Sequence, residues 1–591
     1  MDNQRNLLLA VVLSALLLLG WDAAVGYLYP APPESAAVEG PADTPGEMAA
    51  VAGAGDGALE PGTGVVQPVA VDAALAGGQR VRIDAPRIAG SIDLATGSID
   101  DVVLKDYRES TADDSDFVRL FSPEGTPGQY FAQFGVLANG ERAGGAWQAD
   151  ADALTPDSPV TLRKRGEGGL VYTVRLSIDD EYMIRAEQRI DNTGGDAAVV
   201  QPFALINRTS VTATPSTWIA HSGPVGVFGG SANYDYDYDD VADDRTVSPD
   251  GSASWLGFTD SYWLSALVPA GGDADASFRS LGNDAYRADL IYEPATLAGG
   301  RALTRETQLF VGAKESGVLD GYEDGGIEKF GLAISWGWFW FIERPLLWLL
   351  RTLFDLVGNF GVAIILLTVV VRAFVFPIAQ KGFASMAAMK AIQPQMKSIQ
   401  DKHKDDKVKA QQEIQKLFKD EGVNPLAGCL PMLLQIPIFF ALYKVLILAV
   451  EMRHREFLYI EDLSAPDPAK ILNLFGLLPF DPPGFLGIGI LAVMLGFTMW
   501  LTFRLSPSAM DPMQQQIFNI MPWVLMFVMA PFAAGLLLYW NTSNILTLAQ
   551  QKYLYSKHPG MRAMIEKEKA EKAKEFERKK AEAASQSKAG G

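Results

Sequence analysis

The chain has 591 residues and a formal net charge of −20, and 48% of its residues are hydrophobic. The charge is divided unevenly: residues 22–328 hold 48 acidic against 20 basic side chains, which leaves a balance of +8 for the remainder. An acidic block of this size lacks the basic footprint of a nucleic-acid-binding domain, so we expect no DNA partner. The single cysteine, Cys429, excludes an intrachain disulfide.

An apolar run, Leu7–Trp21, follows Arg5 near the N-terminus. We expect residues 1–22 to form a first transmembrane span that stays in place as an uncleaved anchor. A cleaved signal peptide is the alternative, because the apolar core is short and small residues follow it. Residues 23–79 are rich in Pro, Ala and Gly and predict a flexible tether.

Residues 80–328 predict an all-β domain, because short β-prone segments such as VYTVRLSI and YMIRAEQRI alternate with Gly, Asp and Pro. Two packed sheets, a sandwich, are the expected architecture, with no long helix before Lys329. The Asp and Tyr repeat at 234–240 suggests a calcium loop, yet it lacks the Gly and the distal Glu of such a loop. We therefore expect an edge strand or a loop there.

Residues 329–350 (KFGLAISWGWFWFIERPLLWLL) are dense in Trp and Phe. Aromatic side chains of this kind gather where a membrane meets water, so we expect an interfacial helix on the outer membrane surface. The alternative is a core segment of the β-domain.

Five further spans are predicted in residues 351–551. They are 357–379, 426–450, 483–503 and two short spans within 518–548. The last stretch is too long for one straight helix and contains Pro531, so a tight turn at 530–534 is expected.

The loops fix the orientation of these spans. Loop 380–425 carries nine Lys, and the tail 552–591 carries eleven basic residues against six Glu, so both are expected in the cytoplasm. Loop 451–482 has six acidic against three basic residues and is expected outside. Both termini then lie inside and the β-domain outside.

The cytoplasmic loop 380–425 predicts a helical hairpin. Apolar residues recur at spacings of three and four, including Met386, Met389 and Met396. This stripe is either the seam of the hairpin or an adaptable surface for apolar partners. The basic tail 552–591 is either a solvated charged helix or a segment attracted to ribosomal RNA or anionic lipid.

Arg372 stands inside the apolar run 360–377. A guanidinium stays charged and costs roughly 2.5–3.5 kcal/mol at the centre of a membrane helix. The interiors of the other apolar runs contain no Asp or Glu. We therefore expect the partner of Arg372 to be water, a lipid headgroup or a bound substrate. Snorkelling toward the headgroups near Pro377 is the plainer alternative.

No catalytic constellation is present. The chain lacks HExxH, P-loop, GxSxG and Cys/His metal motifs, so we expect neither an enzyme nor a cofactor nor a bound metal. The four histidines fall in separate loops or the tail, at His221, His403, His454 and His558.

Four segments carry a resemblance to a known family. They are VGNFGVAIILLTVVVRAFVFP (357–377), GVNPLAGCLPMLLQIPIFFALY (422–443), SPSAMDPMQQQIF (506–518) and PFAAGLLLYWNTSNILTLAQQ (531–551). Together they resemble the YidC-type membrane protein insertases, and the N-terminal MDNQRNLLL resembles the bacterial six-span branch of the YidC/Oxa/Alb family. The resemblance spans nearly the whole chain, and is looser over the β-domain. It implies a multi-pass protein of the bacterial inner membrane with a periplasmic super-sandwich inserted between the first and second spans.

The resemblance also implies a site: a hydrophilic groove in which Arg372 attracts the acidic flank of a substrate. Thr368, Phe439, Tyr539 and Trp540 would line the substrate path. Trp540 departs from the family, where a second tyrosine is expected, and this puts polar contact at that point in doubt. We expect Gln435 to help Thr368 replace the hydration of the flank.

The implied function is a membrane protein insertase and chaperone that releases nascent membrane proteins laterally into the bilayer without ATP hydrolysis. The implied partners are nascent membrane proteins, the ribosome, components of the Sec translocon and membrane lipids, with insertion either independent of Sec or together with it. Two alternatives remain: a polytopic transporter or channel that uses Arg372 as an anion site, and a carbohydrate-binding or carbohydrate-active β-domain that the spans merely anchor.

Overall fold

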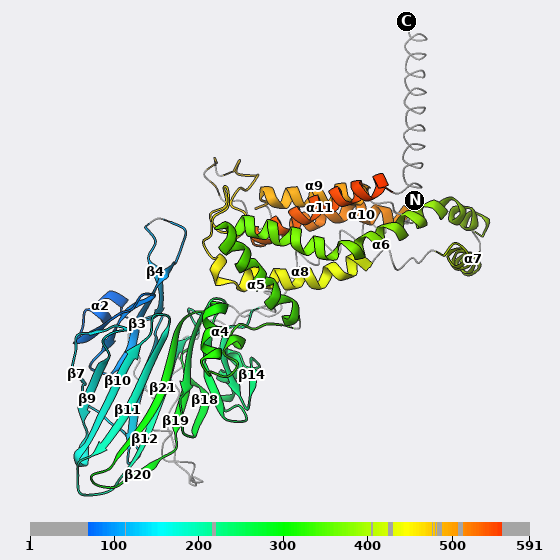
Figure 1. Cartoon of the computed structure of the whole chain (residues 1–591). Coiled ribbons are helices and arrows are strands. Elements are labelled where there is room, and N and C mark those ends of the chain that lie inside the picture. Colours follow the sequence, from blue (N-terminus) through cyan, green and yellow to red (C-terminus); the bar gives the residue numbers. More distant parts are fainter. Residues whose placement is uncertain are drawn as a thin grey trace, which may run out of the picture. The chain divides into compact units, whose positions relative to one another are not determined.

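The structure is a computed structural model, and it describes residues 69–557 with internal gaps (Figure 1). The gaps are residues 113, 215–219, 338, 404–405, 423–429, 476, 479, 481–486 and 506–511. The predicted first span, most of the tether and nearly all of the basic tail lie outside the described residues. The described end of the tether contains a short helix, α2 (Val71–Leu75).

The acidic block is a β-rich domain with two sheets. The first sheet has twelve strands. They are β1 (Arg80–Asp84), β2 (Ile88–Asp93), β3 (Ser98–Arg108), β4 (Phe117–Phe121), β5 (Tyr130–Ala138), β6 (Glu141–Arg142), β8 (Ala153–Leu154), β12 (Ala198–Thr209), β15 (Thr246–Val247), β18 (Ala274–Gly282), β19 (Ala285–Tyr292) and β20 (Ala295–Leu297). Its pairings are antiparallel except for β1 with β8.

The second sheet has nine strands and is antiparallel throughout. They are β7 (Gln148–Ala149), β9 (Val160–Arg165), β10 (Leu170–Ile178), β11 (Met183–Asn192), β13 (Gly223–Phe228), β14 (Ser231–Asn233), β16 (Ala253–Thr259), β17 (Trp263–Pro269) and β21 (Ala302–Ala313). A single 3-10 turn, η2 (Glu167–Gly169), joins β9 to β10.

Alternating side chains explain how these strands pack. In β10 every second residue from Leu170 to Ile178 is buried, while those between them are at least partly exposed. Such a strand presents one face to a core and the other to solvent. The two sheets meet across that core: the Tyr130 hydroxyl lies 2.5 Å from the Ser265 hydroxyl, and the Gln188 amide donates to the carbonyl of Gly135 at 2.9 Å.

The Asp and Tyr repeat at 234–240 forms a loop that leads into a helix, α3 (Tyr238–Asp244). The Asp237 carboxylate accepts from the backbone of Asp239 and Asp240, and the Asp240 carboxylate accepts in turn from the Asp237 N–H. The aspartates therefore cap a helix N-terminus, which the sequence analysis missed.

The structure corrects the bounds predicted for the aromatic helix at 329–350. A 3-10 turn, η3 (Phe330–Ala333), follows a nine-residue helix, α4 (Ser316–Asp324), and the long helix α5 spans Trp340–Val357. Two glycines between residues 330 and 338 disfavour an earlier helix start. Three aromatic side chains of α5 are exposed by 56–68%, namely Trp340, Phe341 and Trp348.

Six helices follow α5. They are α6 (Phe360–Lys402), α7 (Lys407–Asp420), α8 (Leu430–Leu448), α9 (Ile490–Leu505), α10 (Pro512–Met529) and α11 (Ala534–Lys557), the second of which is the outer arm of the predicted hairpin. One short 3-10 turn, η5 (Val450–Met452), follows α8. The predicted turn at 530–534 coincides with the break between α10 and α11.

By length and hydropathy, one helical segment among the described residues, Phe360–Gly382, is able to cross a membrane. Three other apolar helical segments are shorter, at Leu433–Leu448, Ile490–Leu505 and Gln516–Met529.

The first arm of the hairpin is not a separate helix, because α6 continues unbroken through Pro377 and Pro394. Proline is tolerated in membrane helices where neighbouring groups satisfy the freed carbonyl.

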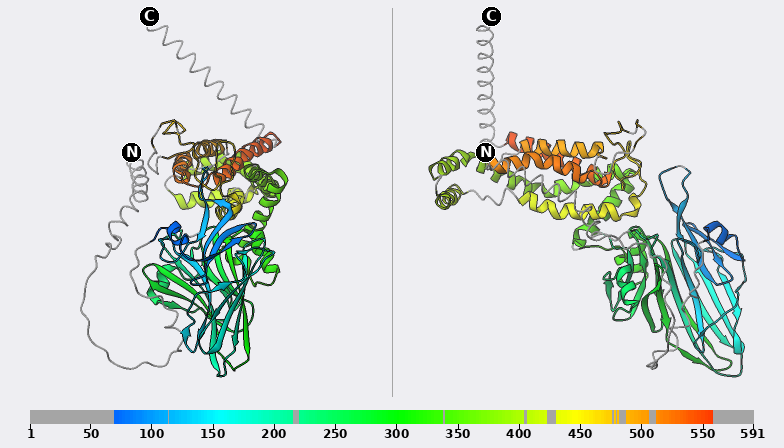
Figure 2. Two further views of the ribbon diagram at one scale, coloured as in Figure 1. Left: turned by 90° about the vertical axis from the view of Figure 1, so that its left-hand side faces the viewer. Right: turned by 180° about the vertical axis from the view of Figure 1, so that it is seen from behind.

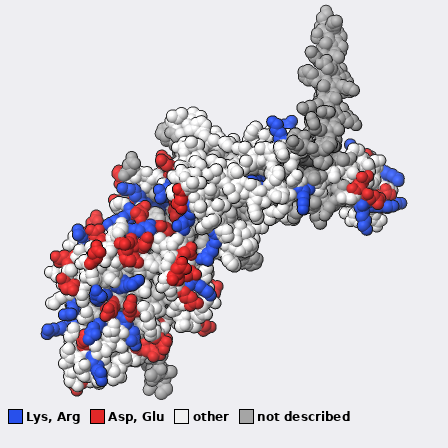
Figure 3. Space-filling view, viewed as in Figure 1, with Lys and Arg blue, Asp and Glu red and all other residues white. Residues whose placement is uncertain are grey.

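The helices α6, α8, α9, α10 and α11 pack side by side in both views of Figure 2. On the face drawn in Figure 3, charged side chains cover the β-domain and the α6–α7 hairpin, whereas the packed helices show few. Their outer faces expose large apolar side chains instead, such as Phe374, Leu433 and Phe497. An apolar exterior of this extent fits lipid rather than water.

A buried charge in the β-domain responds to pH. Lys314 is 3% exposed, donates to the Thr259 hydroxyl at 2.8 Å and lies near Asp260, which is ion-paired with Arg208 at 2.5 Å. Burial lowers the pKa of Lys314 to about 7 despite the attraction of Asp260. The unfolded chain keeps the ordinary lysine pKa of about 10.4.

We predict that Lys314→Met flattens the pH dependence of stability. Between pH 7 and pH 10 the unfolded chain binds more protons at Lys314 than the folded domain, so the free energy of unfolding rises with pH by up to roughly 1 kcal/mol per unit. Thermal melts of residues 69–335 at pH 7 and pH 9 measure this rise. The same substitution at exposed Lys329 is the control. An equal slope in the wild type and the Lys314 variant would contradict the assignment.

Candidate functional site

Three helices each contribute two side chains four residues apart to one side of the helical region. Thr368 and Arg372 come from α6, Gln435 and Phe439 from α8, and Tyr539 and Ser543 from α11. Residues at this spacing lie on the same face of a helix. All of these residues except Ser543 were predicted from the sequence, and contacts between the helices bring them together.

Arg372 is bonded to α11. Its Nε donates to the Ser543 hydroxyl at 3.0 Å, and Nη2 donates to the same oxygen. The expectation that the partner of Arg372 is water, a lipid headgroup or a bound substrate is wrong for this contact, because a hydroxyl of the chain itself accepts from the guanidinium. Among the described residues, however, no carboxylate forms an ion pair with Arg372, so its charge is solvated without being neutralised. This contact directs the guanidinium toward α11. It therefore argues against the alternative in which Arg372 snorkels to the lipid headgroups.

Gln435 and Tyr539 form a second polar contact, in which the Gln435 amide donates to the Tyr539 hydroxyl at 2.8 Å. Tyr539 is only 2% exposed. Thr368 is 1% exposed, and its hydroxyl donates to the carbonyl of Ile364 in its own helix at 2.7 Å. Thr368 therefore lies close to Arg372 along α6, but its hydroxyl already has a hydrogen-bond partner within its own helix.

Aromatic rings join α8 to α11. The Phe439 and Trp540 ring centroids lie 4.8 Å apart, and Phe439 is stacked on Tyr443 at 6.3 Å. Tyr443 in turn contacts Phe532 at 5.3 Å. Tilted aromatic pairs at these separations add about 0.5–1.5 kcal/mol beyond the area they bury. Both Phe439 and Trp540 remain partly exposed, so their outer faces are accessible.

A buried amide network beside this site was missed. The Asn541 amide donates to the carbonyl of Leu491 on α9 at 2.9 Å, and Asn544 donates to the Thr498 hydroxyl at 3.1 Å. Asn541, Ser543 and Asn544 are 1%, 2% and 8% exposed. The sequence signal was available as the polar run NTSN inside an apolar segment, since polar residues in membrane helices usually contact neighbouring helices.

Lys444 of α8 is a cation in a mostly apolar helix, and it is only 9% exposed. The Glu343 carboxyl of α5, which is 2% exposed, attracts it. One oxygen of Glu343 has no hydrogen-bond partner within the described chain. This attraction acts between α5 and α8, which are in contact.

In the hairpin, Ile392 of α6 and Ala410 of α7 are 5% and 8% exposed, which fits a seam between its two arms. Met389 and Met396 are partly buried, and the side chain of Met386 lies outside the described residues. His403 also contacts Glu413 across the hairpin at 3.1 Å.

In the part of the chain that the structure describes, no cluster of three His, Cys, Asp or Glu residues could hold a metal.

Two family models match the chain. Residues 80–349 match the YidC periplasmic domain, and residues 352–561 match the 60Kd inner membrane protein family. The boundary between the two matches falls within α5. The β-rich region and the helical region described above thus correspond to two established domains, and their union is a bacterial inner-membrane protein with a periplasmic domain.

The curated relatives are insertases. The membrane protein insertase YidC of Zymomonas mobilis is 41% identical over 94% of this chain and 96% of its own length. That of Beijerinckia indica is 39% identical, over 95% of this chain and 97% of its own. These comparisons define a membrane protein insertase rather than an enzyme. The chain belongs to the YidC family, which confirms the resemblance found in the sequence, and its substrates are nascent membrane proteins.

Among solved structures, an active YidC insertase is 18% identical, covers 82% of this chain and 94% of its own, and has a TM-score of 0.34. A galactose mutarotase related enzyme from Lactobacillus acidophilus is 8% identical and covers 40% of this chain, with a TM-score of 0.28. Neither similarity is high enough to support an argument about this site.

We predict that Ser543→Ala weakens the contact between α6 and α11. A hydrogen bond to a charged group contributes about 1.5–3 kcal/mol, so the purified protein should melt several degrees lower in detergent. Ser543→Thr keeps the hydroxyl and is the matched control. Equal melting temperatures for the Ala and Thr variants would show that the Arg372 contact contributes nothing.

Proposed function

We propose that Arg372, Thr368, Gln435, Phe439, Tyr539 and Trp540 line a hydrophilic groove that receives nascent membrane proteins. The observation that carries this proposal is the unneutralised charge of Arg372, which is bonded to a hydroxyl and not to a carboxylate. A guanidinium offers five N–H donors, and Ser543 occupies only two of them. The acidic flank of a substrate would supply the missing negative charge.

The groove would lower the barrier to moving that flank across the membrane. Burying an unpaired polar group costs several kcal/mol, and far more for an isolated charge. Arg372 and the amide of Gln435 would replace part of the hydration of the flank, which shortens the apolar distance that remains to be crossed. Attraction in a medium of low dielectric constant is stronger than in water.

The apolar segment of the substrate would slide along the partly exposed rings of Phe439 and Trp540 into the bilayer. Hydrophobic transfer contributes about 25 cal/mol per Å² of apolar surface, so a single segment supplies enough free energy without ATP. Trp540 has an indole N–H as a donor but lacks the acceptor oxygen of a tyrosine. The proposed slide is therefore less polar than a second tyrosine at this position would make it.

The remaining topology is part of the proposal. We place six spans in the membrane, both termini in the cytoplasm and a super-sandwich in the periplasm, with the charge distribution of the loops as support. The predicted units 1–22, 23–79, 80–328, 351–551 and 552–591 are kept as proposed boundaries. The hairpin with Met386, Met389 and Met396, together with the basic tail, would meet the ribosome, and the lipid-exposed helices would meet Sec components.

The substrate path is tested by site-specific photocrosslinking. A photocrosslinker is placed at Phe439 or Tyr539, and stalled ribosome–nascent chains of increasing length are added. A photocrosslinker at the lipid-exposed Phe374 is the control. We expect crosslinks at Phe439 and Tyr539 that follow the nascent apolar segment as it lengthens, and no such progression at Phe374. Two results would favour the transporter alternative instead. One is a crosslinking pattern that does not change with nascent-chain length, and the other is an absence of crosslinks although ribosomes are bound.

We predict that Arg372→Ala slows insertion of substrates with an acidic flank at least about tenfold, equivalent to about 1.4 kcal/mol of activation free energy. Arg372→Lys should retain most of the rate, because the charge is kept. Insertion into proteoliposomes is measured with acidic-flank and neutral-flank versions of one substrate. Arg504→Ala, at the exposed end of α9, is the matched control. An equal loss for both substrate versions would rule out an electrostatic role for Arg372.

A further inference from the structure

The β-domain contains a pocket that no part of the proposed insertase mechanism uses. Its volume is about 240 Å³, and it opens where β9 of the second sheet approaches strands of the first. The lining residues are Ala95, Thr96, Ser98, Glu124, Gln133, Arg142, Ala143, Gly144, Gly145 and Lys164. At about 30 Å³ per water, the pocket has room for about eight waters or one small organic ion.

Two cations face this pocket, Arg142 and Lys164. Among the described residues, neither forms an ion pair with a carboxylate. The single acidic residue in the lining, Glu124, is exposed at the rim. The two cations outnumber the one carboxylate, so the lining of the pocket carries a net positive charge.

The guanidinium of Arg142 is held by an amide whose orientation is fixed. The Gln133 Nε2 donates to the carbonyl of Thr96 at 2.7 Å, so its oxygen faces the other way and accepts from Arg142 Nη2. Gln133 is only 8% exposed. One side of Arg142 is thus fixed, and its remaining N–H groups are left for a ligand.

Lys164 is positioned by aromatic rings. Its Nζ lies 4.3 Å from the centre of the Trp147 ring and donates to the carbonyl of Ala143 at 2.6 Å. Burial and the nearby Arg142 guanidinium lower the pKa of Lys164 to about 8. The ammonium is therefore mostly protonated at neutral pH, and an anion between the two cations would relieve their repulsion.

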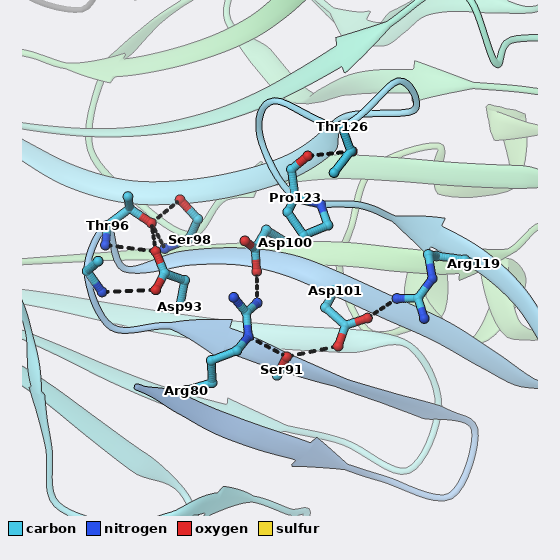
Figure 4. A network of polar contacts seen from close by, with 11 residues as sticks. Arg80, Ser91, Asp93, Thr96, Ser98, Asp100, Asp101, Arg119, Pro123 and Thr126 are labelled. Atoms are coloured by element: carbon cyan, nitrogen blue, oxygen red, sulfur yellow. Dashed lines mark hydrogen bonds and ion pairs between the residues drawn. The ribbon is translucent and has the colours of Figure 1, made fainter. Parts of the chain in front are cut away.

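A hydrogen-bonded turn contributes Thr96 and Ser98 to the lining of the pocket, and Figure 4 shows its contacts. The Asp93 carboxylate accepts from the Thr96 hydroxyl at 2.7 Å, and this hydroxyl lies 2.9 Å from that of Ser98. Gly97 has a φ of +77°, and a Cβ there would lie 2.4 Å from the indole nitrogen of Trp147. Only glycine fits both the backbone conformation and the close approach of the ring.

We propose that this pocket binds a carboxylate, with Arg142 and Lys164 as its charged partners. Arg142 supplies a planar fork that matches two carboxylate oxygens, and Lys164 supplies a point charge behind it. Two sources share this chemistry: a small free dicarboxylic acid and an acidic side chain of an extended polypeptide. The pocket is preorganised for either, because its wall is already fixed.

The test uses the full chain in lipid nanodiscs and saturation-transfer NMR of two probes. The first is glutarate, with uncharged glutaramide as its control. The second is N-acetyl-Gly-Glu-Gly-amide, with N-acetyl-Gly-Gln-Gly-amide as its control. We expect at least one acid to bind and both amides not to bind. In the double variant Arg142→Gln with Lys164→Gln the dissociation constant should rise at least about tenfold, since two charge-assisted contacts are lost.

Arg163→Gln is the matched control, because Arg163 precedes Lys164 on β9 and its exposed side chain lies on the other face of the strand. Arg142→Lys keeps the charge but loses the planar fork, so its affinity should fall between those of the wild type and the double variant. Binding of glutarate alone identifies a free acid as the ligand, and binding of the peptide alone identifies a polypeptide. Absence of binding by both acids, or equal losses in the Arg163 variant and the double variant, would overturn the proposal.

Discussion

A positive charge that cannot be shed, placed inside an apolar helix, is the constraint on which the helical region depends. Arg372 must be solvated where it stands, and the chain does this with a neutral hydroxyl on α11. A carboxylate at that position would have neutralised the guanidinium and removed its attraction for other anions. The hydroxyl accepts from the guanidinium without cancelling its charge, so Arg372 is held in position and stays positively charged.

The surrounding helices are arranged to hold that contact. α11 approaches α6 through Ser543 and approaches α9 through Asn541, whose buried amide bonds to a carbonyl of the neighbouring helix. In lipid there is no hydrophobic force between helices, so such polar contacts and close packing provide much of the association. The aromatic contact between Phe439 and Trp540 adds a third link, from α8. The polar residues of the site thus contribute to packing as well as to chemistry.

Several charged side chains of the β-domain are buried among apolar side chains. Unlike Arg372, they are paired with side chains of opposite charge. Asp260 accepts from Arg208, Thr214 and Ser222, and this leaves few of its lone pairs unused. Asp100 is paired with Arg80, yet burial still raises its pKa to about 6 (Figure 4). Breaking one member of such a buried pair costs more than the pair itself contributes. Of the two networks, the one around Asp260 joins the sheets, because Arg208 lies on β12 of the first sheet and Asp260 follows β16 of the second.

Much of this architecture could be predicted from the sequence, for identifiable reasons. The β-prone segment VYTVRLSI predicted a strand, and β10 forms there with every second residue buried, because side-chain direction along a strand has a period of two. Pro531 predicted a break, and the chain turns between α10 and α11. The continuity of α6 through two prolines was missed, because neighbouring groups and not the local sequence decide whether a helix tolerates proline.

The sequence by itself determined that a charge lies within a membrane helix, that no acidic residue in the other apolar runs neutralises it, and that an acidic β-rich domain is joined to an apolar helical one. These are properties of composition and short-range spacing. Only the tertiary structure decided that Ser543, 171 residues away, solvates Arg372, that Lys444 faces Glu343, and that Arg142 and Lys164 share a pocket. The physical reason is that each of these contacts joins different helices or different sheets, and one-dimensional periodicity reports which face a residue occupies but not which distant residue it meets.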